Sequence, residues 1–305
     1  MKKYFLIILS FFAVNLAHAG ESNGRFFLEG DGKLALRSDK SGILVSGHYR
    51  NADGSYNRAY LDQINRLFGM PAELKEDISL RTIAFVDYLQ DKYAPGKTLR
   101  LLSGYRSPKF NASLRQKGRL AARTSYHIQG MAADLIFPGV DSKAMWEYAR
   151  QLMYGGVGYY DGKSVHIDSG KPRFWTSVSA LPKVDEPPQN KNIYLSVDYD
   201  RYKPGDTMRL FFSGVSEYPF GVSSEWVLKK KDHSVQKVTP ILADSKKVTP
   251  NGCYPMDSRL DSRFLSWQIP TDVRKGESFT LEVPFCDPVT PQMPEKLISR
   301  PFEIN

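Results

Sequence analysis

The chain contains the stretch SYHIQGMAAD at residues 125–134, and VHID follows at residues 165–168. In both stretches a polar side chain alternates with small or apolar ones, which is typical of a strand with one buried face. Asp134 is thereby placed on what is otherwise a core face, and His166 and Asp168 share one face of their strand. A buried carboxylate requires a cationic partner, and a metal ion supplies one. The two stretches therefore predict a β-sheet that holds a polar site.

Two imidazoles and one carboxylate with an open fourth position form a common catalytic zinc sphere, and His127, Asp134 and His166 are the candidate ligands. His127 and Asp134 lie an odd number of positions apart, so a straight strand would place them on opposite faces. Gly130 offers a bend that turns both toward one ion. A structural His–Asp pair in a polar cleft is the alternative, and spacing alone does not decide between the two.

Helices and strands alternate irregularly around these stretches. Apolar residues at helical spacing predict helices over residues 61–69 and 78–89, and Pro108 opens a third helix at the first-turn position that proline tolerates. Short apolar pieces separated by glycine predict a hairpin within residues 26–49. Because no βαβ rhythm is visible, we expect an α+β fold over residues 20–181, with a small antiparallel sheet and flanking helices.

The composition and the hydrophobic pattern of the sequence change after residue 181. Residues 182–190 are rich in proline and read as a linker, and apolar alternating runs separated by turns fill residues 191–305. This pattern predicts a second domain, an immunoglobulin-like β-sandwich. Cys253 and Cys286 lie within it and are expected to form a disulfide. A catalytic or metal-bound thiol is the alternative, which the absence of a nearby histidine disfavours.

The composition and the first residues indicate the class of protein and its compartment. With 41% hydrophobic and 25% charged residues, the chain is neither a disordered tail, a collagen-like repeat nor a disulfide-dense miniprotein. Residues 1–19 have the charged start, short apolar run and small-residue end of a secretory signal peptide. We therefore expect export, in particular to the periplasm, without insertion into the membrane. The net charge of +9 suits acidic partners, but no nucleic-acid motif accompanies it.

The sequence resembles the hedgehog/D-alanyl-D-alanine metallopeptidase family. The pattern S-x-H-x-x-G-x-A-x-D at residues 125–134 matches the zinc signature of that family position for position. Together with SGYRSP at 103–108 and GGVGYY at 155–160, it looks like the exported murein endopeptidase K branch. The resemblance extends over about residues 26–175. It implies a zinc ion held by His127, Asp134 and His166, and peptidoglycan peptide as the substrate.

The resemblance also suggests roles for neighbouring residues. Arg106 matches the arginine that faces developing oxyanion charge in the wider family. Asp168 is the nearest candidate for the general base, although it could instead orient a ligand histidine. Tyr105, Ser125 and Tyr159 lie within the matched motifs and are expected to contact the substrate.

The predicted function is that of a zinc-dependent peptidoglycan endopeptidase that hydrolyses peptide cross-links with metal-activated water. Relatives often supply the base from the positions that Lys163 and Ser164 occupy here, and neither residue suits that role. This departure keeps a non-catalytic, zinc-stabilised wall-binding module open as an alternative. A stem-peptide carboxypeptidase is a second alternative. For the C-terminal domain we expect a wall or protein partner.

Overall fold

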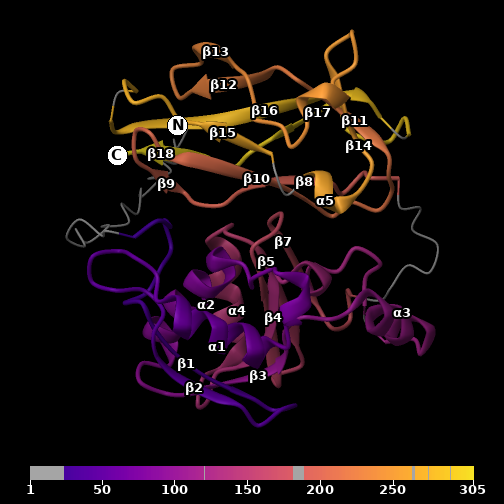
Figure 1. Cartoon of the computed structure of the whole chain (residues 1–305). Coiled ribbons are helices and arrows are strands. Elements are labelled where there is room, and N and C mark those ends of the chain that lie inside the picture. Colours follow the sequence, from indigo (N-terminus) through magenta and orange to yellow (C-terminus); the bar gives the residue numbers. More distant parts are fainter. Residues whose placement is uncertain (1–23, 120, 181–188, 263–264, 274, 289) are drawn as a thin grey trace, which may run out of the picture.

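The computed structural model describes residues 24–119, 121–180, 189–262, 265–273, 275–288 and 290–305. The predicted signal peptide at 1–19 and most of the predicted linker lie outside these residues. Figure 1 shows two stacked bodies, with the helices and one sheet in the N-terminal half and strands alone dominating the C-terminal half. The protein is thus of mixed α+β structure, as the sequence predicts. None of the helices in the described part of the chain combines the length and apolar character that a membrane span requires.

The N-terminal helices begin and end where the sequence offers capping residues. The side chain of Asn57 accepts a hydrogen bond from the Tyr60 amide at the start of α1, and Gly69 ends this helix at a φ of 79°. Ser79, Ser107 and Asp141 cap the next three helices in the same way. The elements are α1 (Arg58–Phe68), the short η1 (Ala72–Leu74), α2 (Leu80–Tyr93), α3 (Pro108–Gln116), the short η2 (Tyr126–Gln129) and α4 (Ser142–Gln151).

A seven-stranded sheet in the order β2-β1-β3-β4-β6-β5-β7 forms the centre of the N-terminal half. The expectation of a small antiparallel sheet is wrong in one respect, because β1 pairs with β3, and β5 with β7, in parallel. A parallel pair needs a long crossover, and α1 and α2 lie in the chain between β1 and β3. The strands are β1 (Lys33–Ser38), β2 (Leu44–His48), β3 (Leu99–Ser103), β4 (Ala132–Ile136), β5 (Gly156–Tyr160), β6 (Ser164–Asp168) and β7 (Arg173–Thr176).

The two faces of this sheet differ in chemistry. On β6, Val165 and Ile167 belong to the apolar core that also contains Phe85 of α2. His166 and Asp168 alternate with them and therefore lie on the opposite face, as their spacing predicts. The helices thus cover one face of the sheet, and the other face is free to hold polar side chains.

The C-terminal half consists of a three-stranded sheet, β15-β10-β8, and an eight-stranded one around β16, with a shared apolar core. Cys253 and Cys286 form a disulfide with a Cα–Cα distance of 5.7 Å. The sequence shows no helical period here, and the structure adds only the short α5 (Arg259–Ser262) and η3 (Ser245–Lys247). The strands are β8 (Tyr194–Val197), β9 (Arg201–Tyr202), β10 (Thr207–Ser213), β11 (Phe220–Ser223), β12 (Trp226–Lys230), β13 (Val235–Val238), β14 (Cys253–Met256), β15 (Ser266–Gln268), β16 (Glu277–Asp287), β17 (Lys296–Ile298) and β18 (Phe302–Ile304).

The two halves are joined by a buried ion pair between Arg81 of α2 and Asp200, which precedes β9. The side chains of these residues are 4% and 1% exposed. The Tyr154 hydroxyl donates to Asp200 Oδ2 over 2.7 Å, and the Phe27 amide donates to the same oxygen over 3.0 Å. Arg300 also donates to the carbonyl of Gly170, just beyond β6, over 2.6 Å. The C-terminal domain is therefore in fixed contact with α2 and with the loop that follows β6.

Candidate metal centre

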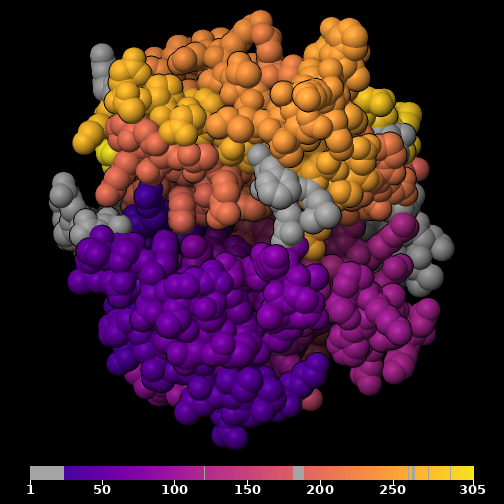
Figure 2. All heavy atoms as spheres, in the orientation of Figure 1, coloured from indigo at the N-terminus to yellow at the C-terminus, as the bar shows by residue number. Residues whose placement is uncertain are grey.

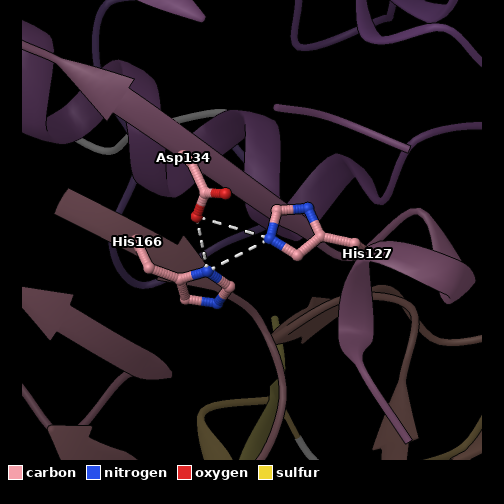
Figure 3. Close-up of side chains that lie close together, drawn as sticks. All are labelled: His127, Asp134 and His166. Carbon is pink, nitrogen blue, oxygen red and sulfur yellow. Dashed lines mark hydrogen bonds and ion pairs between the residues drawn. The ribbon is translucent and has the colours of Figure 1, made fainter. Parts of the chain in front are cut away.

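Three separate elements bring His127, Asp134 and His166 together. His127 lies on η2, Asp134 on β4 and His166 on β6, where Asp134 and His166 are direct partners in the strand register. His166 Nδ1 lies 2.9 Å from Asp134 Oδ1, and His127 Nε2 lies 3.2 Å from His166 Nδ1 and 3.4 Å from Asp134 Oδ1. Figure 3 shows the three side chains converging on one point. All three residues are buried.

A turn on each side of His127 directs its ring toward the sheet. Gly130 ends η2 with a φ of 66°, a left-handed conformation that glycine adopts without strain, so the expected bend is present. The amide of Arg106 donates to the carbonyl of His127 over 3.1 Å and ties η2 to the end of the β3 loop. His127 therefore approaches the sheet from a turn, which resolves the odd spacing between it and Asp134.

The second nitrogen of each imidazole is already engaged. His127 Nδ1 lies 2.7 Å from the carbonyl oxygen of Gly104, which can only accept, so this nitrogen carries the proton. His166 Nε2 lies 2.8 Å from Asp168 Oδ2. Because a carboxylate oxygen accepts hydrogen bonds, the proton of the neutral ring is on Nε2. The lone pairs of His127 Nε2 and His166 Nδ1 therefore face each other and the carboxylate. This arrangement of electron pairs requires a cation, or an extra proton, between them.

The distances suit a small tetrahedral ion. With bonds of about 2.1 Å, a tetrahedral zinc site separates neighbouring ligand atoms by about 3.4 Å. The three separations here are 2.9, 3.2 and 3.4 Å. Nitrogen and carboxylate donors are also the ligands that zinc accepts in catalytic sites. The residues present thus fit a zinc ion, with three protein ligands.

Electrostatics of the group agree with this donor set. Burial lowers the pKa of His127, which favours the neutral ring that a metal ligand needs. Burial alone would raise the pKa of Asp134, but His127 and His166 hold it well below its usual value. Burial alone would lower the pKa of His166, as it does for His127, but hydrogen bonds to Asp134 and Asp168 raise it. A proton on His166 and a metal ion therefore compete for the same position.

Arg106 contacts the ligand carboxylate directly. Its Nη2 atom donates to Asp134 Oδ2 over 2.6 Å, and its Nε atom donates to Ser103 over 2.9 Å. One oxygen of Asp134 is thus held by the guanidinium, which leaves Oδ1 for the two histidines. The structure brings the predicted arginine to the edge of the candidate centre.

Asp168 lies on the side of His166 that faces away from the other two ligands. Its side chain is fully buried, and its two oxygens accept from His166, from both Nη atoms of Arg173 and from the amides of Gly156 and Gly170. These contacts hold the pKa of Asp168 below the usual range, because Arg173 and His166 outweigh the effect of burial. A carboxylate bonded in this way orients the imidazole of His166.

Alternating glycines on β5 clear the polar face for larger side chains. A Cβ atom at Gly158 would lie 2.5 Å from the ring of Trp175, and one at Gly156 would lie 2.3 Å from Asp168 Oδ2. The Trp175 ring can therefore approach His166, with ring centroids 4.9 Å apart. Trp175 is not among the residues predicted from the sequence to belong to the site, although the GxG spacing on a strand is a signal for a close contact of this kind.

The predicted substrate contacts are distributed differently. Tyr159 packs against Trp146 of α4, with ring centroids 6.1 Å apart, so it lies on the helix-covered face and the prediction that it contacts substrate is not supported. Its neighbour Tyr160 lies on the face of Gly158 and accepts a hydrogen bond from Trp175 Nε1 over 3.4 Å. Strand alternation would have favoured Tyr160.

Tyr105 and Ser125 both flank the centre. Tyr105 is half-buried against the core, and its amide donates to the carbonyl of Phe68. Ser125 precedes η2, and its carbonyl accepts from the Ile128 amide. These contacts fix backbone around His127 and leave a substrate role for both side chains as a prediction.

Comparison with known proteins gives a consistent result. The family model described as peptidoglycan L,D-endopeptidase MepK matches residues 31–175. The chain is 30% identical over 163 residues to the protein of that name from Escherichia coli K12, covering 53% of this chain and 78% of the relative, and the Shigella flexneri relative gives the same values. The probable peptidoglycan L,D-endopeptidase MepK of Haemophilus influenzae is 40% identical over 81 residues, covering 26% of this chain and 44% of the relative. No solved structure matches significantly.

Proposed function

Since the chain belongs to the MepK family of peptidoglycan L,D-endopeptidases, we propose that it is a zinc-dependent hydrolase of peptide cross-links in peptidoglycan. The observation on which the proposal rests is the convergence of His127, Asp134 and His166, with one ring nitrogen of each histidine and one carboxylate oxygen turned toward one point. A buried group of this kind has no evident structural purpose without a cation.

The residues around the centre have separable roles. Bound zinc would polarise the scissile carbonyl and lower the pKa of a water molecule, which supplies the nucleophile at neutral pH. Arg106 keeps Asp134 in position and provides fixed positive charge next to the place where oxyanion charge develops. Asp168 is a positioning residue, because its contacts engage both oxygens and leave it no exposed surface. Its earlier interpretation as the general base is therefore not retained.

The names of the relatives support one type of bond. They are called L,D-endopeptidases, so we propose that this chain also cleaves between an L and a D centre, as in a 3-3 cross-link. We also propose export to the periplasm, a peptidase domain over residues 20–181, a linker over 182–190, and an immunoglobulin-like sandwich over 191–305. The two apolar-cored sheets support the last assignment, although Asn190 already bonds to Ser216 within the C-terminal domain.

Digestion of purified wall fragments tests the function. We expect the full-length protein to convert 3-3 cross-linked dimers into monomers in mass spectra of muropeptides, with activity lost on chelation and restored by zinc. His166→Ala should lose bound zinc, measured by elemental analysis, and lose at least about 1000-fold in rate. Asp141→Asn, at an exposed helix cap that asparagine also satisfies, is the control.

Three outcomes would contradict the proposal. Shortened monomers without loss of dimers would indicate a carboxypeptidase. Cleavage that survives complete removal of metal would exclude the zinc mechanism. Zinc bound stoichiometrically by a folded protein that cleaves no wall fragment would indicate a binding module.

A further inference from the structure

A run of positive charge adjoins the metal centre in the sequence. No acidic residue occurs between Asp91 and Asp134. Within this interval, the described residues 107–119 and 121–125 form a segment that we call the cationic arm. Its cations are Lys109, Arg115, Lys117, Arg119 and Arg123.

The base of the cationic arm is fixed at the candidate metal centre. The arm begins directly after Arg106, which contacts Asp134, and ends directly before η2, which holds His127. The backbone hydrogen bond from Arg106 to His127 closes the loop at this base. Within the arm, the side chain of Asn111 donates to the carbonyl of Ala122 over 2.9 Å and ties its two sides together.

The rest of the arm stands apart from the helices that cover the sheet. Figure 1 shows α3 at one side of the N-terminal half, away from α1, α2 and α4, and Figure 2 shows the same magenta segment in relief on the surface. All five cationic residues of the arm are exposed. A chain of substrate that reaches the metal centre from this side would therefore pass along the arm.

The cations of the arm have no acidic partners among the described residues. Across the part of the chain that the structure describes, none of the five cations forms an ion pair with an acidic side chain. By contrast, Arg100, which is also exposed, pairs with Asp39 over 2.6 Å, and Arg58 pairs with Asp77 over 2.6 Å. A cluster of exposed, like-signed charges without internal partners repels itself and is stabilised by an anionic ligand.

We infer that the cationic arm docks the carboxylate-rich stem peptides of polymeric peptidoglycan and so holds the polymer beside the metal centre. This inference deepens the proposed function and rests on it. Guanidinium groups bind carboxylates in a planar, two-point manner, and three of the five arm cations are arginines. Each exposed contact is weak, but several contacts to one polymer add together, and all of them are screened by salt. The arm thus acts on affinity for the intact wall and not on bond cleavage itself.

Neutralisation of the arm in the full-length protein tests this inference. The arm variant is Lys117→Gln/Arg119→Gln/Arg123→Gln. The matched control is Lys231→Gln/Lys246→Gln/Lys275→Gln, which removes the same number of exposed cations from the C-terminal domain. Binding to purified sacculi is measured by co-sedimentation on ice at low and high salt. Sacculi with amidated carboxylates serve as the matched ligand.

We expect the arm variant to bind native sacculi about tenfold more weakly than wild type at low salt, while the control variant binds like wild type. Amidation of the sacculi should remove the difference, and the kcat for a small soluble cross-linked fragment should be unchanged. The single variants Lys117→Gln and Arg123→Gln should each show part of the loss, which guards against a folding defect in the triple variant.

Equal binding of the arm and control variants to native sacculi would overturn the inference. So would a difference that persists on amidated sacculi, or one that is seen only with anionic phospholipid vesicles, which would indicate a membrane partner. Because sacculus binding is measured without cleavage, a protein that cleaves no peptidoglycan would refute the proposed function and leave this test of the arm intact.

Discussion

The two domains differ in the number and position of the ionisable side chains that they bury. In the N-terminal domain His127, Asp134, His166 and Asp168 are all buried on one face of the sheet and bonded to one another. In the described residues of the C-terminal domain, the core is formed by apolar side chains and Asp200 is the one buried carboxylate. Its partner, Arg81, belongs to the other domain.

This contrast indicates where each domain acts. Desolvated charges are costly unless they are paired, so they persist where a ligand, a metal or a partner surface compensates for them. The N-terminal domain places four buried ionisable side chains around the candidate metal centre, namely His127, Asp134, His166 and Asp168, and the C-terminal domain places its one buried carboxylate at the contact between the two halves. The C-terminal domain is thereby docked against the peptidase and is not merely tethered to it.

The largest effect should come from the contact itself. Asp200→Ala leaves the Arg81 guanidinium buried without its partner and should lower the free energy of unfolding by about 3–5 kcal/mol. Asp39→Ala breaks an exposed Arg–Asp pair instead and should cost less than about 1 kcal/mol. Urea unfolding of both variants measures the difference. Equal losses would show that the domain contact contributes no more than a surface pair.

A second prediction concerns a buried carboxyl of the N-terminal domain away from the centre. Burial raises the pKa of Asp87 to about 7, and its Oδ2 accepts from the Tyr49 hydroxyl and the Gly32 amide. The native state then binds a proton that the unfolded state releases near pH 4, so the free energy of unfolding falls as the pH rises from about 4 to 7, by up to about 4 kcal/mol. Asp87→Asn should flatten this dependence in urea unfolding series. An unchanged slope would refute it.

The apolar C-terminal domain should depend instead on its cross-link. Cys253→Ser/Cys286→Ser opens a loop of 33 residues and should lower the stability of this domain by about 3–4 kcal/mol. Zinc affinity of the folded protein should not change, because the disulfide joins β14 to β16 within the C-terminal domain and the ligands lie in the N-terminal domain. Loss of zinc in the folded double variant would show that the two domains are coupled more tightly than their contacts indicate.

The smallest effect is expected for Asp168, which is hydrogen-bonded to the candidate metal ligand His166. Asp168→Asn keeps the shape of the side chain but removes the charge that orients His166, and should weaken zinc binding about 10- to 100-fold. Competition with a chelating dye measures the affinity. A pH–rate profile separates the roles, because a positioning residue changes metal occupancy and leaves the profile of the zinc-saturated enzyme intact. If the variant at saturating zinc no longer showed one of the pH-dependent changes in rate seen in wild type, Asp168 would be the general base.

Local alternation of residues was enough to predict much of the centre. The period of two on β4 and β6 places Asp134 and His166 on one face, and the bend at Gly130 provides for His127. The same period applied to β5 would have selected Tyr160 over Tyr159, because Gly158 lies directly opposite His166. The prediction of Tyr159 took the motif as a unit and did not separate the two alternating faces of the strand.

Other features depend on register between distant elements and could not be predicted. The approach of Trp175 to His166 requires the parallel pairing of β5 with β7. The pairing of Arg81 with Asp200 joins residues 119 positions apart, and nothing in the sequence near either residue indicates the other. Such contacts follow from the docking of whole surfaces, which no local pattern encodes.

The position of Asp200 also connects the domain contact to the strand β18. The carbonyl of Asp200 accepts a hydrogen bond from the amide of Glu303 in β18, the most C-terminal strand. The backbone at the domain contact is therefore fixed by a strand that lies more than 100 positions further along the chain. The helix that contains Arg81 also contacts Ser169, the residue after β6, through Thr82, so the contact between the domains adjoins the strand that holds His166.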